Sequence, residues 1–352
     1  MQYWEEEIQK ISSQIEKMLP GGGLDTGDRL GDIFRLLLQG KVWEVLRILF
    51  HDMKGMIMNE AGGMVQLVVL LLGIGLIAAL LLHFTELFEN RQIADIGFYF
   101  VYLFLVLILI GIFEVIMETG ETLVEHILLF LKLFMPLYFM AVGAASGVTT
   151  ALLGYQLVLL LIFGVEMIFA GVLMPMIKVY LFLVLMNGLW MEERLHMLLE
   201  LLKRCIGYLL KLLIAVITGV NVVQSLITPV IDSVQLTALQ KSIAAIPGIG
   251  TLGSSVAEMM AGSAILIKNS VGVMAVLLLF LICAVPVVKI WLLSMTLKLG
   301  AALCNIVSDR RITSCMDQVG EGGLLVFRTV AAACGLFFIT IAIASISTNR
   351  GF

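Results

Sequence analysis

Charged residues are scarce in this sequence. Aspartate, glutamate, lysine and arginine together make up 14% of its 352 residues, against roughly 25% in a soluble globular domain. The formal net charge is −4 and no tract of basic residues occurs, which argues against a nucleic-acid partner. Apolar residues make up 61% of the chain, and its mean hydropathy is +1.07. The composition therefore excludes a soluble domain and indicates a protein that lies in the lipid bilayer.

The side chains needed for catalysis or metal binding are also few and scattered. The four histidines lie outside the apolar blocks and far apart, and no Walker A, HExxH or GxSxG motif occurs. The run from Gly248 to Gly253 matches G-x-G-x-x-G, but no strand precedes it, so close helix packing or a re-entrant turn is favoured over dinucleotide binding. We therefore expect no enzyme, no cofactor and no metal site. The five cysteines include no CxxC pair and are expected to be small buried apolar residues: Cys205, Cys283, Cys304, Cys315 and Cys334.

The N-terminus does not show the features of a secretory signal peptide, because MQYWEEEIQK has neither a basic n-region nor an apolar h-region. Either Met1 is an added start that follows processing, or the first apolar block directs insertion. Residues 1–60 form the only long water-compatible segment. Its pattern is compatible with two short amphipathic helices on or near the membrane surface, and equally with a partly ordered leader.

Apolar residues come in blocks of about 20, the length of a helix that crosses some 30 Å of hydrocarbon. Strands of a membrane barrel would alternate apolar and polar residues, so the sequence predicts an all-α polytopic membrane protein, a helical bundle. The 38 residues from Leu152 to Leu189 are almost wholly apolar. They would measure about 57 Å as one straight helix, so we expect a break at Gly171 to Pro175. The other expected spans are 64–82, 98–113, 127–145, 209–227, 271–299 and 324–345.

Polar segments between the apolar blocks predict how the chain is oriented. Loops 192–211 and 305–321 hold most of the lysine and arginine near span ends, so both should face the cytoplasm. When the predicted spans are counted from these two loops, residues 1–60 and the C-terminus are expected on the outer side of the membrane. An acidic loop at 114–125 should also face away from the cytoplasm. Its glutamates form either a solvated face or a cation funnel: Glu114, Glu118, Glu121 and Glu125.

A shift of 111 residues maps part of the sequence onto itself. Pro136 falls on Pro247, Pro175 on Pro286 and Lys178 on Lys289, without a gap. Internal repeats are common in membrane transport folds, where ligand sites lie at broken helices between the copies. We therefore predict a parallel internal repeat of about 111 residues. The expected divisions are an N-terminal extracytoplasmic segment (1–60), a first transmembrane helix and loop (61–97), repeat 1 (98–208), repeat 2 (209–319) and a final transmembrane helix and tail (320–352).

Helix breaks and lone charges in apolar surroundings are the candidate functional positions. The glycine-rich segment 247–262 is too polar for a plain span. We interpret it as a re-entrant or broken helix, which has to be buried in protein or face a water-filled cavity. A proline-broken helix frees carbonyl oxygens that can coordinate a cation, and ionisable groups at this depth usually face a bundle interior. The alternative to a functional role is that the lysine side chains extend to the lipid headgroups. The expected breaks are Pro136, Pro175, Pro247 and Pro286, and the candidate polar path comprises Glu166, Lys178, Gly248, Gly250, Lys268, Asn269 and Lys289.

Three short runs resemble one known family. IPGIG at 246–250, LIKN at 266–269 and PVVK at 286–289 are together similar to the stage III sporulation protein AE family of endospore-forming bacteria. The resemblance is clearest from Leu236 to Ile343, and upstream it depends on the order of the spans.

This resemblance implies a multi-pass subunit of the channel complex between mother cell and forespore, located in the outer forespore membrane. The implied partners are other stage III sporulation membrane proteins encoded with it, a partner in the forespore membrane, and the lipid bilayer. Family members generally begin with a secretory signal peptide, and this sequence departs from that pattern. Two roles stay open: a channel or transport subunit required for forespore development, and a scaffold that holds the complex together without conducting. The family has no established site residues to carry over.

Overall fold

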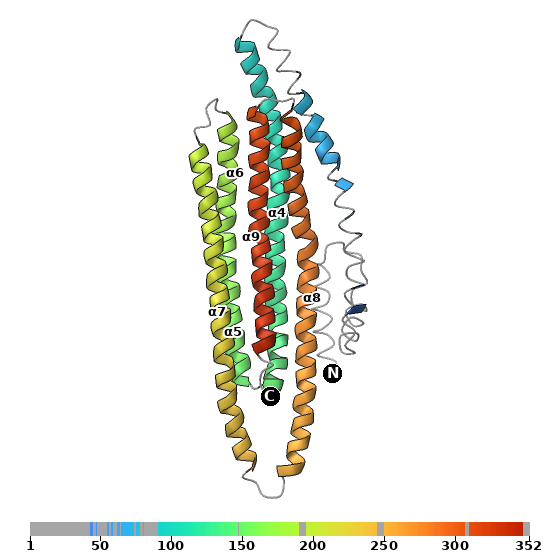
Figure 1. Cartoon of the computed structure of the whole chain (residues 1–352), viewed down its shortest axis with the longest axis vertical. Helices are drawn as coiled ribbons and strands as arrows, with labels where there is room; N and C mark the ends of the chain where they lie inside the picture. Colours follow the sequence, from blue (N-terminus) through green and yellow to red (C-terminus); the bar gives the residue numbers. More distant parts are fainter. Residues whose placement is uncertain are drawn as a thin grey trace.

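Every described element of this chain is a helix. The computed structural model describes residues 91–146, 148–189, 195–244, 250–306 and 310–347, with scattered positions between 43 and 80; the side chains at 91–95, 98, 144–150, 153, 189, 224–268 and 343–347 lie outside the description. Figure 1 shows the helices running side by side along the axis of an elongated bundle. They are α4 (Arg91–Ser146), α5 (Val148–Ile168), the π-helical turn η1 (Phe169–Leu173), α6 (Met174–Leu189), α7 (His196–Ala244), α8 (Gly250–Cys304) and α9 (Arg310–Ser347).

Five segments within the described residues are long and apolar enough to cross a membrane. The prediction of an all-helical, multi-pass protein is confirmed to that extent. A shorter apolar helix, Val65–Ile77, lies within the predicted first span. The 111-residue repeat and the division of the chain that follows from it stay predictions. The five segments are Tyr99–Gly143, Gly154–Gly188, His196–Val223, Asn269–Cys304 and Arg310–Ala342.

The predicted acidic loop at 114–125 is wrong, because α4 is one continuous helix of 56 residues. Apolar residues continue to recur at helical spacing between the glutamates, and Ile116, Leu123 and Ile127 are buried in the core. Glutamate is itself a good helix former, so a run of acidic residues need not end a helix. A helix of this length measures about 84 Å, more than twice the hydrocarbon thickness of a bilayer.

The basic segments expected as loops are also mostly helical. Helix α7 begins at His196 and α9 begins at Arg310, so little of 192–211 or 305–321 lies outside a helix. Both segments carry apolar residues that pack inward, among them Ile206 and Met316, and these keep the helical pattern going through the charges. The starts of α7 and α9 lie at the same end of the bundle in Figure 1.

The four prolines differ in what they do to the helices. Helices α4 and α8 continue through Pro136 and Pro286, so the breaks expected at these two positions are not seen. In a packed bundle, neighbouring helices and small local adjustments compensate for the one backbone hydrogen bond that each proline removes. Pro247 lies outside the described residues. Helix α8 already begins at Gly250, and no re-entrant turn is seen between Gly250 and Gly262.

The break expected at Gly171 to Pro175 takes the form of a π-helical turn. Pro175 has no N–H to donate to the carbonyl four residues earlier, and its ring would collide with that carbonyl. In the turn, the N–H of Met174 instead donates to the carbonyl of Phe169, five residues earlier. Helix α6 therefore continues the direction of α5, as Figure 1 shows, and the chain does not reverse here.

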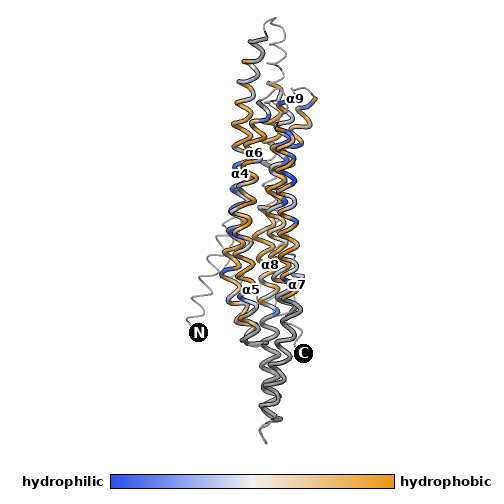
Figure 2. Tube along the Cα trace, turned by 90° about the vertical axis from the view of Figure 1, so that its left-hand side faces the viewer, coloured by the Kyte–Doolittle hydropathy of each residue, from blue (hydrophilic) through white to orange (hydrophobic). Residues whose placement is uncertain are grey.

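Helix α9 lies at the centre of the bundle and contacts α4, α6, α7 and α8. In Figure 2, α4, α5 and α6 lie on one side and α7 and α9 on the other, and α8 contacts both α4 and α9. Glycines let α9 approach its neighbours closely: a Cβ on Gly320 would lie 3.2 Å from the carbonyl oxygen of Ser294 on α8. Of the five spans, the apolar stretch of α9 is the most buried, with 56% of it inside the bundle, and that of α7 is the least buried, with 22%. Helix α7 is thus held along one face only.

Contacts between helices fix which residues lie at the same height along the bundle axis. Gly322 on α9 faces Phe113 on α4, and Glu321 on α9 pairs with Lys203 on α7. Farther along, Asn221 of α7 pairs with Thr340 of α9. Helices α4, α7 and α9 therefore run parallel, with the region around residue 114 of α4 level with residue 203 of α7.

Candidate functional site

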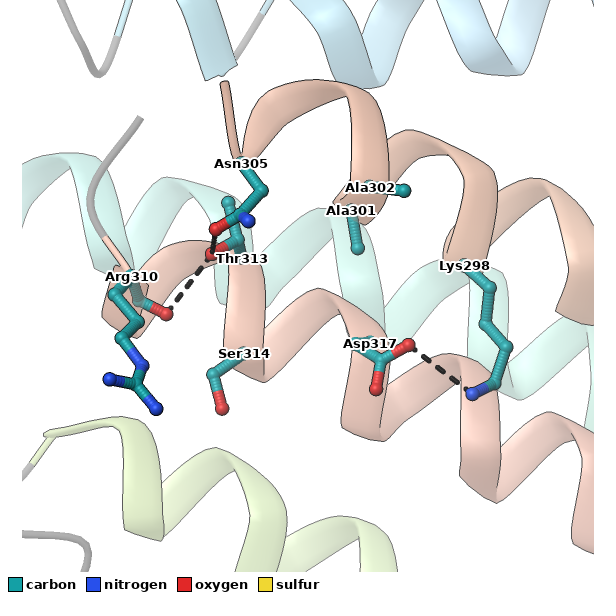
Figure 3. A pocket seen from close by; sticks show the side chains of 8 residues that line it. All are labelled: Lys298, Ala301, Ala302, Asn305, Arg310, Thr313, Ser314 and Asp317. Carbon is teal, nitrogen blue, oxygen red and sulfur yellow. Dashed lines mark hydrogen bonds and ion pairs between the residues drawn. The ribbon is translucent and has the colours of Figure 1, made fainter. Parts of the chain in front are cut away.

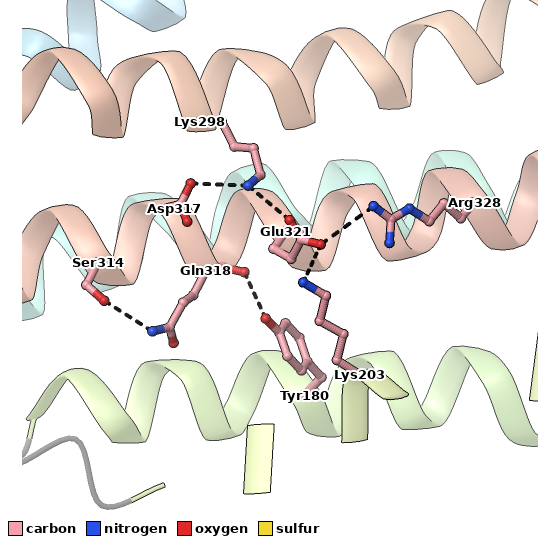
Figure 4. Close-up of polar contacts among 8 residues, drawn as sticks. All are labelled: Tyr180, Lys203, Lys298, Ser314, Asp317, Gln318, Glu321 and Arg328. Atoms are coloured by element: carbon pink, nitrogen blue, oxygen red, sulfur yellow. Dashed lines mark hydrogen bonds and ion pairs between the residues drawn. The ribbon is translucent and has the colours of Figure 1, made fainter. Parts of the chain in front are cut away.

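A row of polar residues follows one face of α9. Its positions are separated by four, three, four and seven residues, which places them on the same side of a helix with 3.6 residues per turn. Lysines reach this row from the helices on either side, Lys203 from α7 and Lys298 from α8 (Figure 4). We call the whole set the polar seam. Its α9 residues are Arg310, Ser314, Asp317, Glu321 and Arg328.

Glu321 is the residue that joins three helices in this seam. Its Oε1 lies 2.7 Å from Lys203 Nζ and its Oε2 lies 2.9 Å from Lys298 Nζ, so one carboxylate binds α7 and α8 to α9. Arg328 approaches the same Oε1 at 3.7 Å. The Glu321 side chain is only 14% exposed. Removing it would leave Lys203 without this counter-charge and Lys298 with Asp317 alone, in partly buried positions, which is more costly than losing a surface pair.

Around Glu321, further hydrogen bonds bring in a fourth helix. Lys298 also pairs with Asp317 at 3.2 Å. The amide of Gln318 donates to Ser314 Oγ at 3.1 Å, and the hydroxyl of Tyr180 on α6 donates to the carbonyl of Gln318 at 3.5 Å. Three cations, Lys203, Lys298 and Arg328, face two carboxylates here, so the local charge is about +1.

At the upper end of the seam the side chains line a cavity of about 250 Å³, shown in Figure 3. It lies where α8 ends and α9 begins. The Thr313 hydroxyl donates to the carbonyl of Arg310 at 3.1 Å and lies 3.2 Å from Asn305 Oδ1, which fixes the two helix ends together. The cavity is large enough for several water molecules. Its lining residues are Lys298, Ala301, Ala302, Asn305, Arg310, Thr313, Ser314 and Asp317.

The seam presents charge and hydrogen-bonding groups but no catalytic or metal-binding constellation. Within the described residues, no group of three or more histidine, cysteine, aspartate or glutamate side chains is placed to hold a metal ion. All five cysteines are free thiols. The interpretation as buried apolar residues is confirmed for four of them, whereas Cys205 is exposed on α7.

The comparison with known proteins decides the family. The family model described as stage III sporulation protein AE matches residues 29–348. The chain belongs to this family. One relative, the stage III sporulation protein AE of Bacillus subtilis (strain 168), is 22% identical over 263 residues, which cover 74% of this chain and 66% of the relative. The match thus spans just under two thirds of that relative's length. No solved structure matches the chain.

For this stage III sporulation protein AE family member, two of the sequence-predicted residues form ion pairs away from the seam. Lys178 on α6 pairs with Glu121 on α4 at 2.8 Å. Glu166 on α5 pairs with Lys132 on α4 at 2.9 Å. All four side chains are between 40% and 57% exposed. These pairs hold α4 to the rod formed by α5 and α6.

The other predicted positions lie on α8 or before it. Asn269 and Lys289 are partly exposed on α8, and Lys289 is nine residues from Lys298, about half a turn round the helix. Gly250 opens α8. Gly248 and the side chain of Lys268 lie outside the described residues. A path through these positions stays a prediction.

Sequence reasoning missed the polar seam itself. Lys203, Asp317 and Glu321 fell within segments expected to be solvent-exposed loops, and Lys298 was not singled out. The signal that could have found them is the helical spacing of polar residues from Arg310 to Arg328. That spacing predicts one polar face on a helix, whereas a loop has no reason to keep it.

Proposed function

We propose that this chain is a channel or transport subunit of the complex between mother cell and forespore, and that its polar seam lines a water-filled path. The polar seam is the observation that carries the proposal. On α9, the side chains of Asp317 and Arg328 are 55% and 54% exposed. Helix α7 contacts α9 on one side of the seam, and α8 contacts it on the other. The seam is thus open toward one side of the bundle.

The surroundings of the seam are apolar, which is why its opening needs an explanation. Exposed apolar side chains lie beside its upper end, as at Leu303 on α8, and below it, as at Ile339 on α9. Charged groups that face hydrocarbon are costly and normally face water or protein instead. A seam whose centre, around Glu321, carries a local charge of about +1 therefore fits a surface in contact with water.

Family membership supports the setting of this proposal. We assign the chain to the outer forespore membrane, with other stage III sporulation membrane proteins and a forespore membrane protein as partners. Arg204, Arg310 and Arg311 lie near the starts of α7 and α9. The tendency of arginine and lysine to stay in the cytoplasm supports an orientation in which this end of the bundle faces the mother-cell cytoplasm.

The second candidate function is a scaffold that holds the complex in the membrane and conducts nothing. One observation favours it: only 22% of the apolar stretch of α7 is buried, which leaves a broad surface for a partner helix. In a scaffold, a partner would cover the seam and exclude water from it.

Thiol labelling separates these two roles. In a background with Cys205→Ser, single cysteines are placed at Ser314 in the seam and at Phe182, an exposed apolar position on α6. Membranes from sporulating cells, which contain the assembled complex, are treated with a charged thiol reagent that requires a hydrated thiolate. We expect Ser314→Cys to react and Phe182→Cys to stay unreacted. Equal, slow reaction at both positions would reject the channel and leave the scaffold.

The same assay extends to the path predicted from the sequence. Cysteines at Lys268, Asn269 and Lys289 should react with the reagent if water also reaches α8 along this line. Thr329→Cys, which is fully buried on α9, serves as the protected reference for these positions.

A further inference from the structure

An exposed acidic stripe runs along the outer face of α4. We define it as Glu114, Glu118 and Glu125, all exposed. Glu121, which lies between them, is already paired with Lys178. Among the described residues, none forms an ion pair with the three stripe glutamates. Three exposed carboxylates that pair with none of the described residues favour a cationic partner from outside the chain.

The same chain carries a complementary basic face on the other side of the bundle. We define this face as Arg204 and Lys211 on α7 together with Arg328 on α9, which is also the last residue of the polar seam. Arg204 is bound only to Glu200, one turn away at 2.6 Å. Lys211 lies 5.9 Å from the centroid of the Tyr208 ring, and Arg328 is 3.7 Å from its nearest carboxylate oxygen. All three side chains therefore have capacity for an additional carboxylate.

The acidic stripe and the basic face lie at the same height along the bundle axis. Gly322 faces Phe113, next to Glu114, and Glu321 pairs with Lys203, next to Arg204. Lys211 is seven residues beyond Arg204, and Glu125 is eleven beyond Glu114, so the two sets extend over roughly 11 and 17 Å in the same direction. Two parallel copies placed side by side would bring the sets together without a vertical shift.

Farther along the bundle axis, an apolar surface follows the acidic stripe on α4, and another follows the basic face on α7. Beyond Glu125, the outer face of α4 exposes Leu129 and Met140, at 43% and 52%, and Lys132 between them is paired with Glu166 of the same copy. Beyond Lys211, α7 has a shallow apolar hollow of about 680 Å³. Its lining includes two small residues one turn apart, Ala215 and Gly219, which permit close helix approach in membranes. The order from charge to apolar surface therefore matches on the two faces.

We propose that a second copy of this chain docks here, with its α4 lying along α7 of the first copy. The acidic stripe of one copy then meets the basic face of the next, beside the polar seam. Because the two faces differ, the contact is head-to-tail, and repetition gives a ring or an open row of parallel copies in the membrane. This interface does not depend on the proposed transport function.

Disulfide trapping in the full-length chain tests the interface. One copy carries Glu114→Cys with Cys205→Ser, and a second, differently tagged copy carries Arg204→Cys with Cys205→Ser. The matched control for the second copy keeps the native Cys205 and Arg204. Positions 204 and 205 are at the same height but about 100° apart round α7. After oxidation with copper phenanthroline, we expect a mixed disulfide dimer with Arg204→Cys and little or none with the native Cys205.

Charge reversal provides an independent measurement. Glu118→Lys together with Glu125→Lys should reduce the 114–204 disulfide yield several-fold, and Lys211→Glu in the other copy should restore part of it. Absence of the 114–204 disulfide would overturn the proposal, as would an equal yield with native Cys205. If either cysteine variant fails to accumulate in the membrane, Glu125→Cys with Lys211→Cys tests the same contact, because these two positions are the closest in height in this part of the interface. None of these results depends on the labelling of Ser314→Cys, so the two proposals can fail separately.

Discussion

Asn221 on α7 donates a hydrogen bond from Nδ2 to Thr340 Oγ1 on α9, at 3.1 Å, and both side chains are buried. The Thr340 hydroxyl in turn donates to the carbonyl of Leu336 at 2.8 Å. Asn221 Oδ1 accepts no hydrogen bond within the described part of the chain. This pair fixes the register of α7 against α9 below the polar seam, in a contact that is otherwise apolar.

The Asn221 and Thr340 pair predicts an asymmetric response to mutation. Thr340→Val should lower the free energy of unfolding by about 1 to 3 kcal/mol, because it leaves the buried amide of Asn221 without its acceptor. Asn221→Leu should change it by less than about 1 kcal/mol, because it also removes the unpaired Oδ1 and Thr340 keeps its bond to Leu336. Thermal unfolding in detergent micelles measures both. Equal losses for the two variants would contradict this account of the pair.

Glu321 should be the most sensitive charged residue of the seam. Glu321→Gln leaves Lys203 and Lys298 without their shared carboxylate, and we expect a loss of about 1 to 3 kcal/mol after allowing for partial exposure. Asp317→Asn is the matched control, since Asp317 is 55% exposed and its pair should be worth less than about 1 kcal/mol. Unfolding of the purified chain is again the measurement. The ranking is wrong if Asp317→Asn proves the more damaging change.

Two glycines of α9 should respond in opposite ways to alanine. A Cβ on Gly320 would lie 2.8 Å from Lys298 Cγ and 3.2 Å from the Ser294 carbonyl oxygen, whereas Gly335 has open space around it. Gly320→Ala should therefore destabilise the contact between α8 and α9 by about 1 to 3 kcal/mol. Gly335→Ala should be neutral or stabilise α9 by up to about 1 kcal/mol through helix propensity. Melting temperatures of the two variants test this, and a neutral Gly320→Ala would mean that the helices can separate without cost.

The path predicted on α8 can be tested by removing its charges. If water or a solute passes along α8, Lys268→Leu and Lys289→Leu should each lower spore yield while the protein still accumulates in the membrane. Lys178→Leu is a suitable comparison, because its exposed pair with Glu121 should contribute less than about 1 kcal/mol to stability. Normal spore yield and normal complex assembly for both α8 variants would exclude a path through these lysines.

The sequence contained enough information for the class of fold but not for the ends of the helices. Apolar blocks of membrane length predicted helices that cross the bilayer. A π-helical turn lies at the break predicted next to Pro175, but the helical span continues through it from Gly154 to Gly188. The segment from Glu114 to Glu125 was predicted to be a loop because charged residues lower the mean hydropathy of a segment. The backbone hydrogen bonds of a helix are local, however, and the buried residues Ile116 and Val124 continue the helix beneath those charges.

The polar seam was missed for a related reason. Its ion pairs join Lys203, Lys298 and Glu321, which come from three helices and lie up to 118 residues apart in the chain. A single sequence shows where each charge lies but not which helices become neighbours. Only the spacing of polar residues along α9 was available as a signal, and it becomes meaningful once that segment is known to be helical.

The most direct test of the central claim, that a solute path follows the polar seam, is the spore yield of cells whose own copy is replaced by Ser314→Trp. Ser314 lines the cavity of about 250 Å³, and an indole there would fill it. Phe182→Trp, on the outer surface of α6, is the control, and membrane levels of both proteins are compared. We expect Ser314→Trp to reduce spore yield strongly at a normal protein level, with Phe182→Trp unaffected. Equal yields from the two variants at equal protein levels would contradict the account.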